Sequence, residues 1–309
     1  MAIRHMRKLA ILHKLETAYG TDVTPLAADA LIASNVTFQP LEGQEVSRDL
    51  MLPYLGNQGV VLAGLYARLE FDVEIAGAGE AGTVPKYGSL LRICGLSETV
   101  TVDTDVTYAI VEDDVESGSL YFVSDKVQHV MLGCRSNVSL TFTPKGIPHF
   151  RFTVMGLLGT ITDVGAMPAV SETGWTEPLI VSKANTALTL HDWTAVAESF
   201  SVDLGNTVTP RFLIGDERMA ITDRNTSGTA VVEGRSLATV DWFALARART
   251  RDALQLIHGI AAGNTVEVNA PKVEVGRPTQ GQTDGIVNYS LPLILTPDAG
   301  RDELTIVVR

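Results

Sequence analysis

The sequence contains little cysteine. Only Cys94 and Cys134 occur among 309 residues, and they lack the CxxC spacing of redox and zinc motifs. Two cysteines cannot build a disulfide scaffold, so we expect two packed thiols in a reducing compartment. A single bridge between the two remains open at this point. The class of small disulfide-rich extracellular proteins is excluded.

Basic clusters and long apolar runs are also missing. With 24 basic and 36 acidic side chains the net charge is −12, and no block of Lys and Arg could grip a phosphate backbone. Nowhere do about 18 apolar residues follow one another, the length that a membrane-spanning helix needs. The basic start is followed by an apolar stretch that His13 and Lys14 interrupt, which is unlike a signal peptide. We expect a soluble protein that neither holds nucleic acid tightly nor spans a membrane.

Signatures of catalysis and metal binding are absent from the sequence as well. The histidines form no HExxH motif and no i, i+4 pair, since they stand at positions 5, 13, 129, 149, 191 and 258. His129 and Cys134 are near neighbours, but a zinc site there needs two more ligands from elsewhere. No serine or cysteine has the local signature of a hydrolase. We predict no catalytic, cofactor-binding or metal-binding residues and no enzyme activity.

Two short motifs match functional patterns only in part. Residues 77–82 read GAGEAG, but the strand before them alternates with charge and Glu80 would face a bound pyrophosphate. Residues 112–116 read EDDVE, but they lack the glycine and terminal glutamate of a calcium loop. We interpret the first as a flexible loop and the second as a solvated acidic loop.

The clearest patterns in the sequence are those of β-strands. Residues 68–75 (RLEFDVEI) and 137–142 (NVSLTF) alternate between apolar and polar side chains, which predicts half-buried antiparallel strands. Residues 150–158 form the expected hairpin partner of the second strand. One short helix is predicted near 86–95. The first 33 residues lack a clean period and predict an extended arm, with Ile11, Leu12 and Leu15 buried on this domain or on a neighbouring subunit.

The second half of the sequence repeats this order. Alternation at 198–204 and 228–233 precedes a helix that Thr239 could cap, with Trp242, Leu245 and Ala246 on one face and Arg247, Arg249 and Arg251 near its end. Strands follow at 254–257, 265–275 and 286–295, with 276–285 as a polar turn. We predict a mainly β protein with two tandem β-sandwich or barrel domains, each with a short α-helix. The expected division is an N-terminal arm over 1–33, domains over 34–167 and 191–309, and a linker over 168–190.

Several segments, taken in order, resemble phage major tail tube proteins of long-tailed, siphovirus-type bacteriophages. In the first half they are KLETAYGTD at 14–22, SNVT at 34–37, PLEG at 40–43, RDL at 48–50 and PYLG at 53–56. In the second half they are ESFSVDLGNT at 198–207, ITDR at 221–224, the helix from Thr239, DGI at 284–286 and LPL at 291–293. The resemblance spans almost the whole chain.

The resemblance implies a virion structural protein. Members of that family form a β-sandwich or barrel with a short helix, and six such domains complete a ring. Two domains in one chain would give a homotrimeric, pseudo-hexameric ring, which we favour over a hexamer of single-domain chains. The partners it implies are further copies of the chain, a tape measure protein, and tail terminator and distal tail proteins. DNA would be a transient, non-specific passenger during ejection, and an acidic protein suits its passage because carboxylates repel phosphates. Assembly would take place in the cytoplasm of the host bacterium.

Two other classes of function stay open. Another tube or ring component, such as a tail terminator or a secretion-system tube, could share this fold and differ in copy number. A carbohydrate-binding or enzymatic β protein could assemble its site from distant loops. A pocket with convergent polar groups of perturbed pKa would support that reading.

Overall fold

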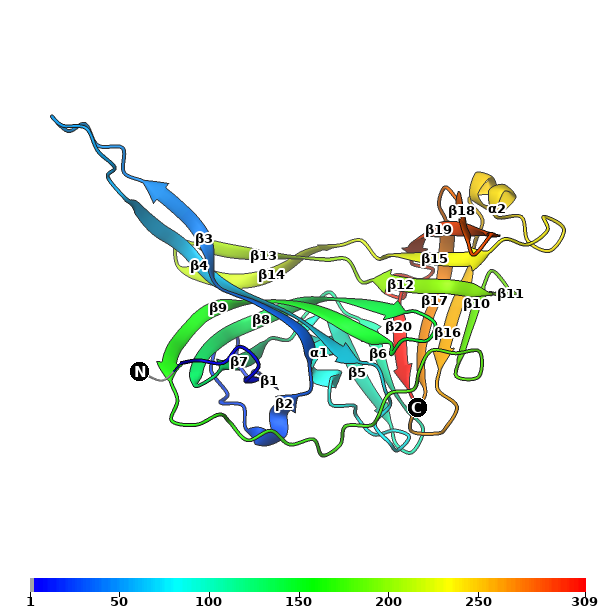
Figure 1. The fold of residues 1–309 in the computed structure, drawn as a ribbon, viewed down its shortest axis with the longest axis horizontal. Coiled ribbons are helices and arrows are strands. Elements are labelled where there is room, and N and C mark those ends of the chain that lie inside the picture. The colour runs from blue at the N-terminus through cyan, green and yellow to red at the C-terminus, as the bar shows by residue number, and fades with distance from the viewer. Residues whose placement is uncertain (1–2) are drawn as a thin grey trace.

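The computed structural model describes residues 3–309, so the first two residues of the predicted arm lie outside the described part. Over residues 3–309 the chain forms twenty β-strands, two α-helices and one short 3-10 helix, η1 (Ala27–Asp29). Eighteen strands join one antiparallel sheet, and the remaining two form a separate hairpin (Figure 1). The mainly β class with short helices is confirmed.

The first half of the chain, which we define as residues 9–163, forms a run of neighbouring strands. Seven of its strands are β1 (Leu9–Leu15), β2 (Ala30–Leu31), β3 (Ser34–Ser47), β4 (Val60–Glu74), β7 (Gly118–Ser124), β8 (Val127–Phe142) and β9 (His149–Asp163). They pair antiparallel in the order β1, β7, β8, β9, β4, β3, and β2 flanks β1 on its other side. The expected strands at 68–75 and 137–142, with the hairpin partner at 150–158, are therefore present.

The second half, residues 186–308, repeats this order of pairing. Its corresponding strands are β10 (Thr186–Leu190), β12 (Ala197–Asp203), β15 (Ser227–Glu233), β16 (Arg251–His258), β17 (Val266–Val275) and β19 (Ile286–Thr296). They pair in the order β10, β16, β17, β19, β15, β12, and β11 (Trp193–Thr194) flanks β10. Each position in the first run thus has a counterpart in the second, in the same direction along the chain.

Two strand pairs connect the halves into one sheet. One joins β12 to the end of β8. The other joins β20 (Thr305–Val308) to β6 (Asp105–Ile110), which itself pairs with β5 (Leu96–Thr101). The core is continuous across both halves because the inward residues of each run are apolar and buried. Phe142 of the first half and Phe200 of the second illustrate this, because both are buried and their ring centroids are 6.3 Å apart. Burying a side chain of this size contributes roughly 1.5–3 kcal/mol.

Both predicted helices form, but one cap differs from the prediction. They are α1 (Gly88–Ile93) and α2 (Trp242–Ala248). Asp241, rather than Thr239, caps α2, and its carboxylate accepts a hydrogen bond from the Ala244 amide at 2.9 Å. Thr239 belongs to the turn before the helix, where its amide donates to the Ser236 carbonyl at 2.8 Å. Trp242 is buried, as expected for the inward face.

The structure also differs from the prediction in three connecting segments. The polar turn expected over 276–285 contains a strand, β18 (Thr279–Thr283), that pairs with β19 and leaves only Asp284 and Gly285 at the turn. All five residues of β18 are exposed and none is apolar, so hydrophobic alternation could not reveal the strand. Within the segment predicted as an arm, β1 is an integral strand that buries Ile11 and Leu12 in this chain. The expected linker ends in β10, which pairs with β16.

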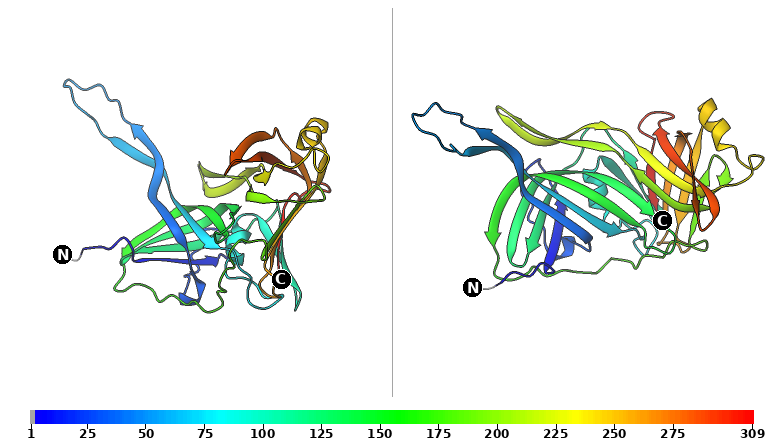
Figure 2. Two further views of the ribbon diagram at one scale, coloured as in Figure 1. Left: turned by 45° about the vertical axis from the view of Figure 1, so that its right-hand side comes forward. Right: turned by 45° about the horizontal axis from the view of Figure 1, so that its top comes forward.

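Two long hairpins leave the body of the sheet. The hairpin of β3 and β4 projects into solvent, whereas β13 (Asn206–Leu213) and β14 (Asp216–Arg224) extend from the second half back over β8 and β9 (Figures 1 and 2). There Phe212 approaches Tyr66 with ring centroids 6.5 Å apart, and Met219 is fully buried. The second half therefore covers the first with its hairpin and contacts β4 at Tyr66, whereas residues 43–63 of the first-half hairpin are all exposed.

The cap of α2 gives a test of the local structure. Asp241→Ala should lower the free energy of unfolding by about 1 kcal/mol, because an amide at the helix start loses its acceptor. Thr239→Ala removes a hydroxyl without a capping role and is the matched control. Urea denaturation monitored by tryptophan fluorescence measures both. A larger loss in the Thr239 variant would contradict this assignment of the cap.

Candidate assembly surface

The titratable groups of the core serve packing rather than chemistry. Burial lowers the pKa of His13 to about 4, and its Nδ1 lies 3.0 Å from the Ser89 hydroxyl. Burial raises the pKa of both cysteine thiols, and both are free in the structure. A buried thiol that stays protonated is a poor nucleophile and a poor metal ligand. Over residues 3–309 the structure contains no cluster of three or more potential metal ligands.

The cavity beside the linker lacks the convergent charged groups of an enzyme site. A cavity of about 660 Å³ lies between the linker and the second half and is lined mainly by apolar side chains such as Phe142, Val181, Leu188 and Phe200. Lys183 is the one charged residue in its lining. A catalytic or sugar-binding site needs several convergent polar groups. The GAGEAG segment is a loop between β4 and α1.

A hydrogen-bonded junction holds the two halves together where β8 meets β12. Phe200 to Asp203 pair in register with Phe142 to Ser139. The Asn137 amide donates to the Asp203 carboxylate at 2.7 Å, and its carbonyl accepts from the Asn206 backbone at 2.8 Å. Backbone pairing and side-chain hydrogen bonds therefore both fix the register at this junction.

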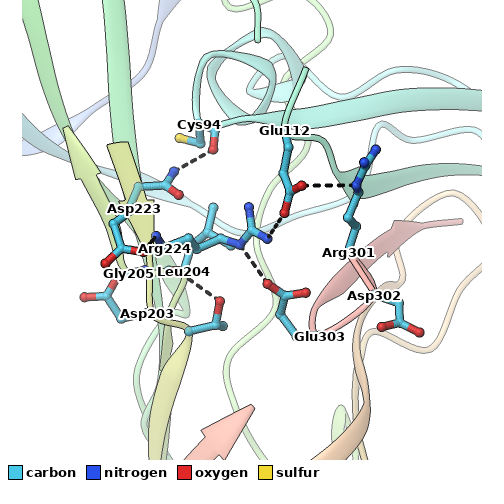
Figure 3. A network of polar contacts seen from close by, with 12 residues as sticks. Cys94, Glu112, Asp203, Leu204, Gly205, Asp223, Arg224, Arg301, Asp302 and Glu303 are labelled. Carbon is cyan, nitrogen blue, oxygen red and sulfur yellow. Dashed lines mark hydrogen bonds and ion pairs between the residues drawn. The ribbon is translucent and has the colours of Figure 1, made fainter. Parts of the chain in front are cut away.

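A group of ion pairs supports the same contact from another side. Figure 3 shows Arg224 of β14 between two carboxylates, with Glu303 at 2.7 Å and Glu112 at 3.4 Å. Arg301 lies 3.2 Å from the other oxygen of Glu112. Glu112 belongs to the segment interpreted as a solvated acidic loop, and the structure shows that it binds arginines of the second half. Glu112 and Arg224 border a cleft of about 320 Å³. Sequence reasoning missed these pairs because their partners are far apart in the sequence, by 79 residues for Arg224 and Glu303 and by 112 for Arg224 and Glu112.

The N-terminal segment adds a third connection. The Glu16 carboxylate accepts hydrogen bonds from the Gly20 and Gly133 amides at 2.7 and 2.8 Å and from two serine hydroxyls, Ser117 and Ser119, at 2.7 and 2.9 Å. These bonds hold a turn that carries Tyr19. The Tyr19 hydroxyl accepts from the Met219 amide of β14 at 2.6 Å. The segment thus anchors the second-half hairpin on the first half.

The surface that this chain leaves uncovered is large and apolar. Ten large apolar residues between positions 41 and 62 are exposed on the projecting hairpin: Leu41, Val46, Leu50, Met51, Leu52, Tyr54, Leu55, Val60, Val61 and Leu62. Met51 and Leu55 at its tip are fully exposed, as is Ile214 at the tip of β13 and β14. Monomeric proteins rarely expose contiguous apolar surface of this kind. The hairpin is therefore a candidate surface for contact with another protein molecule.

Over residues 3–309 two unpaired strand edges stand out. β3 pairs only with β4, and β18 pairs only with β19, so each has one free row of backbone N–H and C=O groups. β5, β13 and β14 also have one unpaired side, but each of them carries charged residues. Residues 34–39 and 279–283 contain no charged side chain, whereas the outer part of β3 carries Glu42 and Glu45. Edge strands of monomeric proteins usually carry charges that oppose further pairing. The candidate site of this protein is therefore an assembly surface made of the projecting hairpin and two open edges.

Comparison with known families agrees with this character. Residues 6–293 match the family model described as phage tail tube protein. No curated protein matches the chain. The matched range includes β1 at one end and most of β19 at the other, so it contains the repeated run of strands in both halves. Within the described residues, none of the helices is long and apolar enough to cross a membrane.

The ion pairs between the halves give a stability test. Arg224→Met should lower the free energy of unfolding by about 3 kcal/mol, because Glu303 is nine-tenths buried and would lose its closest cation. Arg301→Met is the matched control, since both partners of its pair with Glu112 are more than half exposed. An exposed pair is worth at most about 1 kcal/mol. Chemical denaturation at neutral pH measures both. Equal losses in the two variants would show that Arg224 does not clamp the halves.

Proposed function

This chain belongs to the phage tail tube protein family, and we propose that its copies close into rings that stack as the DNA conduit of a siphovirus-type tail. Membership of the family gives the coarser part of this statement, a structural role in the virion tail. The observation that carries the finer part is the open assembly surface. A chain with an exposed apolar hairpin and two strand edges that include uncharged stretches is incomplete as a monomer.

We propose that the chain holds two tandem tube domains, over 34–167 and 191–309, so that three copies complete a pseudo-hexameric ring. The repeated strand order supports two domains, because a duplicated domain would produce the same pairings twice, and it adds β1 to the first domain and β10 to the second. The contact between β8 and β12 supports it further, since it joins one half to the next in the way that neighbouring domains of a ring would join.

Stacking of rings would use the hairpin tips. Met51, Leu55 and Ile214 are fully exposed at the ends of two hairpins that leave the body of the sheet. Apolar tips of this kind gain by burial against the next ring. At its two ends such a tube would meet terminator and distal tail proteins, and a tape measure protein would occupy it before DNA. These partners follow from the family and are part of the proposal.

Assembly is the direct test of this function. The smallest soluble species should have three times the 33.1 kDa mass of one chain, and electron micrographs of concentrated protein should show long hollow tubes. Native mass spectrometry and negative-stain imaging provide the two measurements. Six chains per ring would contradict tandem domains. Rings that never stack would favour the alternative function, a tail terminator.

Passage of DNA gives a second test. The net charge of −12 suits a conduit, because carboxylates on an inner wall repel phosphates and keep DNA from sticking. Replacing the carboxylates that line the inner wall of the imaged tube by lysine should slow DNA ejection from assembled virions. The same number of replacements on the outer wall is the control. Ejection at the normal rate from both sets would remove repulsion as a reason for the acidic composition.

A further inference from the structure

The two halves of this chain dock on each other through the pairing of β12 with β8. The repeated topology would allow an equivalent pairing at a second place. β8 has β9 on one side, and on the other it pairs first with β7 and then, over Ser139 to Phe142, with β12. On its other side β12 pairs with β15. Along the chain β12 continues into β13, which lies over the first half (Figure 1).

In this contact β8 is the acceptor strand and β12 is the strand added to it. The counterpart of β8 in the second half is β17 together with β18. Both strands pair with β19 on one side, and β17 pairs with β16 on the other. β18 has no neighbour on the side of β16. β18 therefore corresponds to the end of β8 in the first half. The end of β8 pairs with β12, whereas β18 has no equivalent partner strand in the chain that the structure describes.

The counterpart of the inserted strand is β3. β12 pairs with β15 and β8, whereas β3 pairs with β4 alone. β3 also belongs to a hairpin, and that hairpin projects away from the chain instead of lying over a neighbour. The molecule thus has one donor edge and one acceptor edge that are unused, and these lie towards opposite ends of it in Figure 1.

We infer that β3 of one copy pairs antiparallel with β18 of the next copy, in the way that β12 pairs with β8 within the chain. The occupant of each open edge is thus a second copy of this protein. This inference rests on the proposed ring and specifies its joint. Donor and acceptor are different surfaces, so the contact is head-to-tail and generates a closed ring rather than a twofold dimer.

The repeat also fixes the register of the joint. Glu74 of β4 and Glu233 of β15 end corresponding strands and pair with His149 and Asn288. The other residues are matched by their distance from these two pairs along the paired strands. Gln39 then corresponds to Asp203, and Thr279 corresponds to Ser139. Asp203 and Ser139 are direct partners within the chain. Gln39 should therefore lie opposite Thr279 of the neighbouring copy.

The same geometry accounts for the projecting hairpin. β13 and β14 lie over β8 and β9, so the corresponding extension of β3 and β4 would lie over β18 and β19 of the neighbour. That face of β19 carries Ile286 and Ile294, both of which are exposed in the single chain. Contact with the hairpin would bury apolar residues on both copies.

Disulfide cross-linking tests the joint. Directly opposed residues of an antiparallel pair have Cα atoms about 4.5–5.5 Å apart, within the range of a disulfide. A chain with both Gln39→Cys and Thr279→Cys, assembled and mildly oxidised, should shift on a non-reducing gel to bands of two and three chains. Both sites are exposed on the single chain, and the native thiols are buried, so unmodified protein should stay at one chain.

Three further samples make the result specific. Gln39→Cys with Gln280→Cys shifts the register by one residue and places the thiols on opposite faces of the sheet, so it should not cross-link. A mixture of the two single variants should give bands of two chains only. Gln39→Cys alone should remain a single chain.

The outcomes separate this joint from the ring itself. Assembled tubes in which the Gln39 and Thr279 cysteines fail to cross-link would overturn the joint and leave the ring standing. Efficient cross-linking of Gln39→Cys alone would also overturn it, because that result requires a twofold contact between β3 strands. Failure of the unmodified protein to form rings under any condition would overturn both.

Discussion

Backbone hydrogen bonding at the edges of the sheet is the constraint on which this structure depends. A strand that ends a sheet exposes a full row of N–H and C=O groups, and it must be paired, covered or guarded by charge. Within the chain, β12 and β20 meet this need by pairing with β8 and β6 of the other half. β3 and β18 do not meet it within one copy. The same chemistry that joins the halves therefore also requires a partner outside the chain.

The side chains around the junction make the internal pairing specific. A sheet edge alone would tolerate a slip of one residue, which turns every side chain to the other face. Asn137 prevents this, because its donor and its acceptor both find partners only when Asp203 lies beside it. Arg224, Glu112 and Glu303 add charged contacts that need both halves in place. The halves are consequently held in one arrangement, which the proposed stacking of rings would require of each subunit.

The sequence predicted those elements in which apolar and polar side chains follow the buried and exposed faces. The strand at 68–75 was recognisable because one face meets the core and the other meets polar neighbours, and α2 because Trp242 and Leu245 lie on one face. β18 was not recognisable, because both faces of this edge strand are exposed and its side chains therefore do not alternate between apolar and polar. The cap of α2 was misplaced by two residues, since Thr239 and Asp241 have similar capping preference and only the turn geometry separates them. The contacts of Glu112 and Tyr19 could not be predicted, because they join positions more than a hundred residues apart.

The difference between the two hairpins agrees with their different tasks. The hairpin of β13 and β14 docks on a half to which it is covalently joined, so its target is present at a very high effective concentration. In the proposed ring, the hairpin of β3 and β4 would find its target on a separate molecule and would have to overcome the entropy lost in association. More apolar surface offsets that loss, and the ten exposed apolar residues between positions 41 and 62 provide it. Under this proposal a duplicated domain would diverge as observed, with the more apolar hairpin on the half that binds between chains.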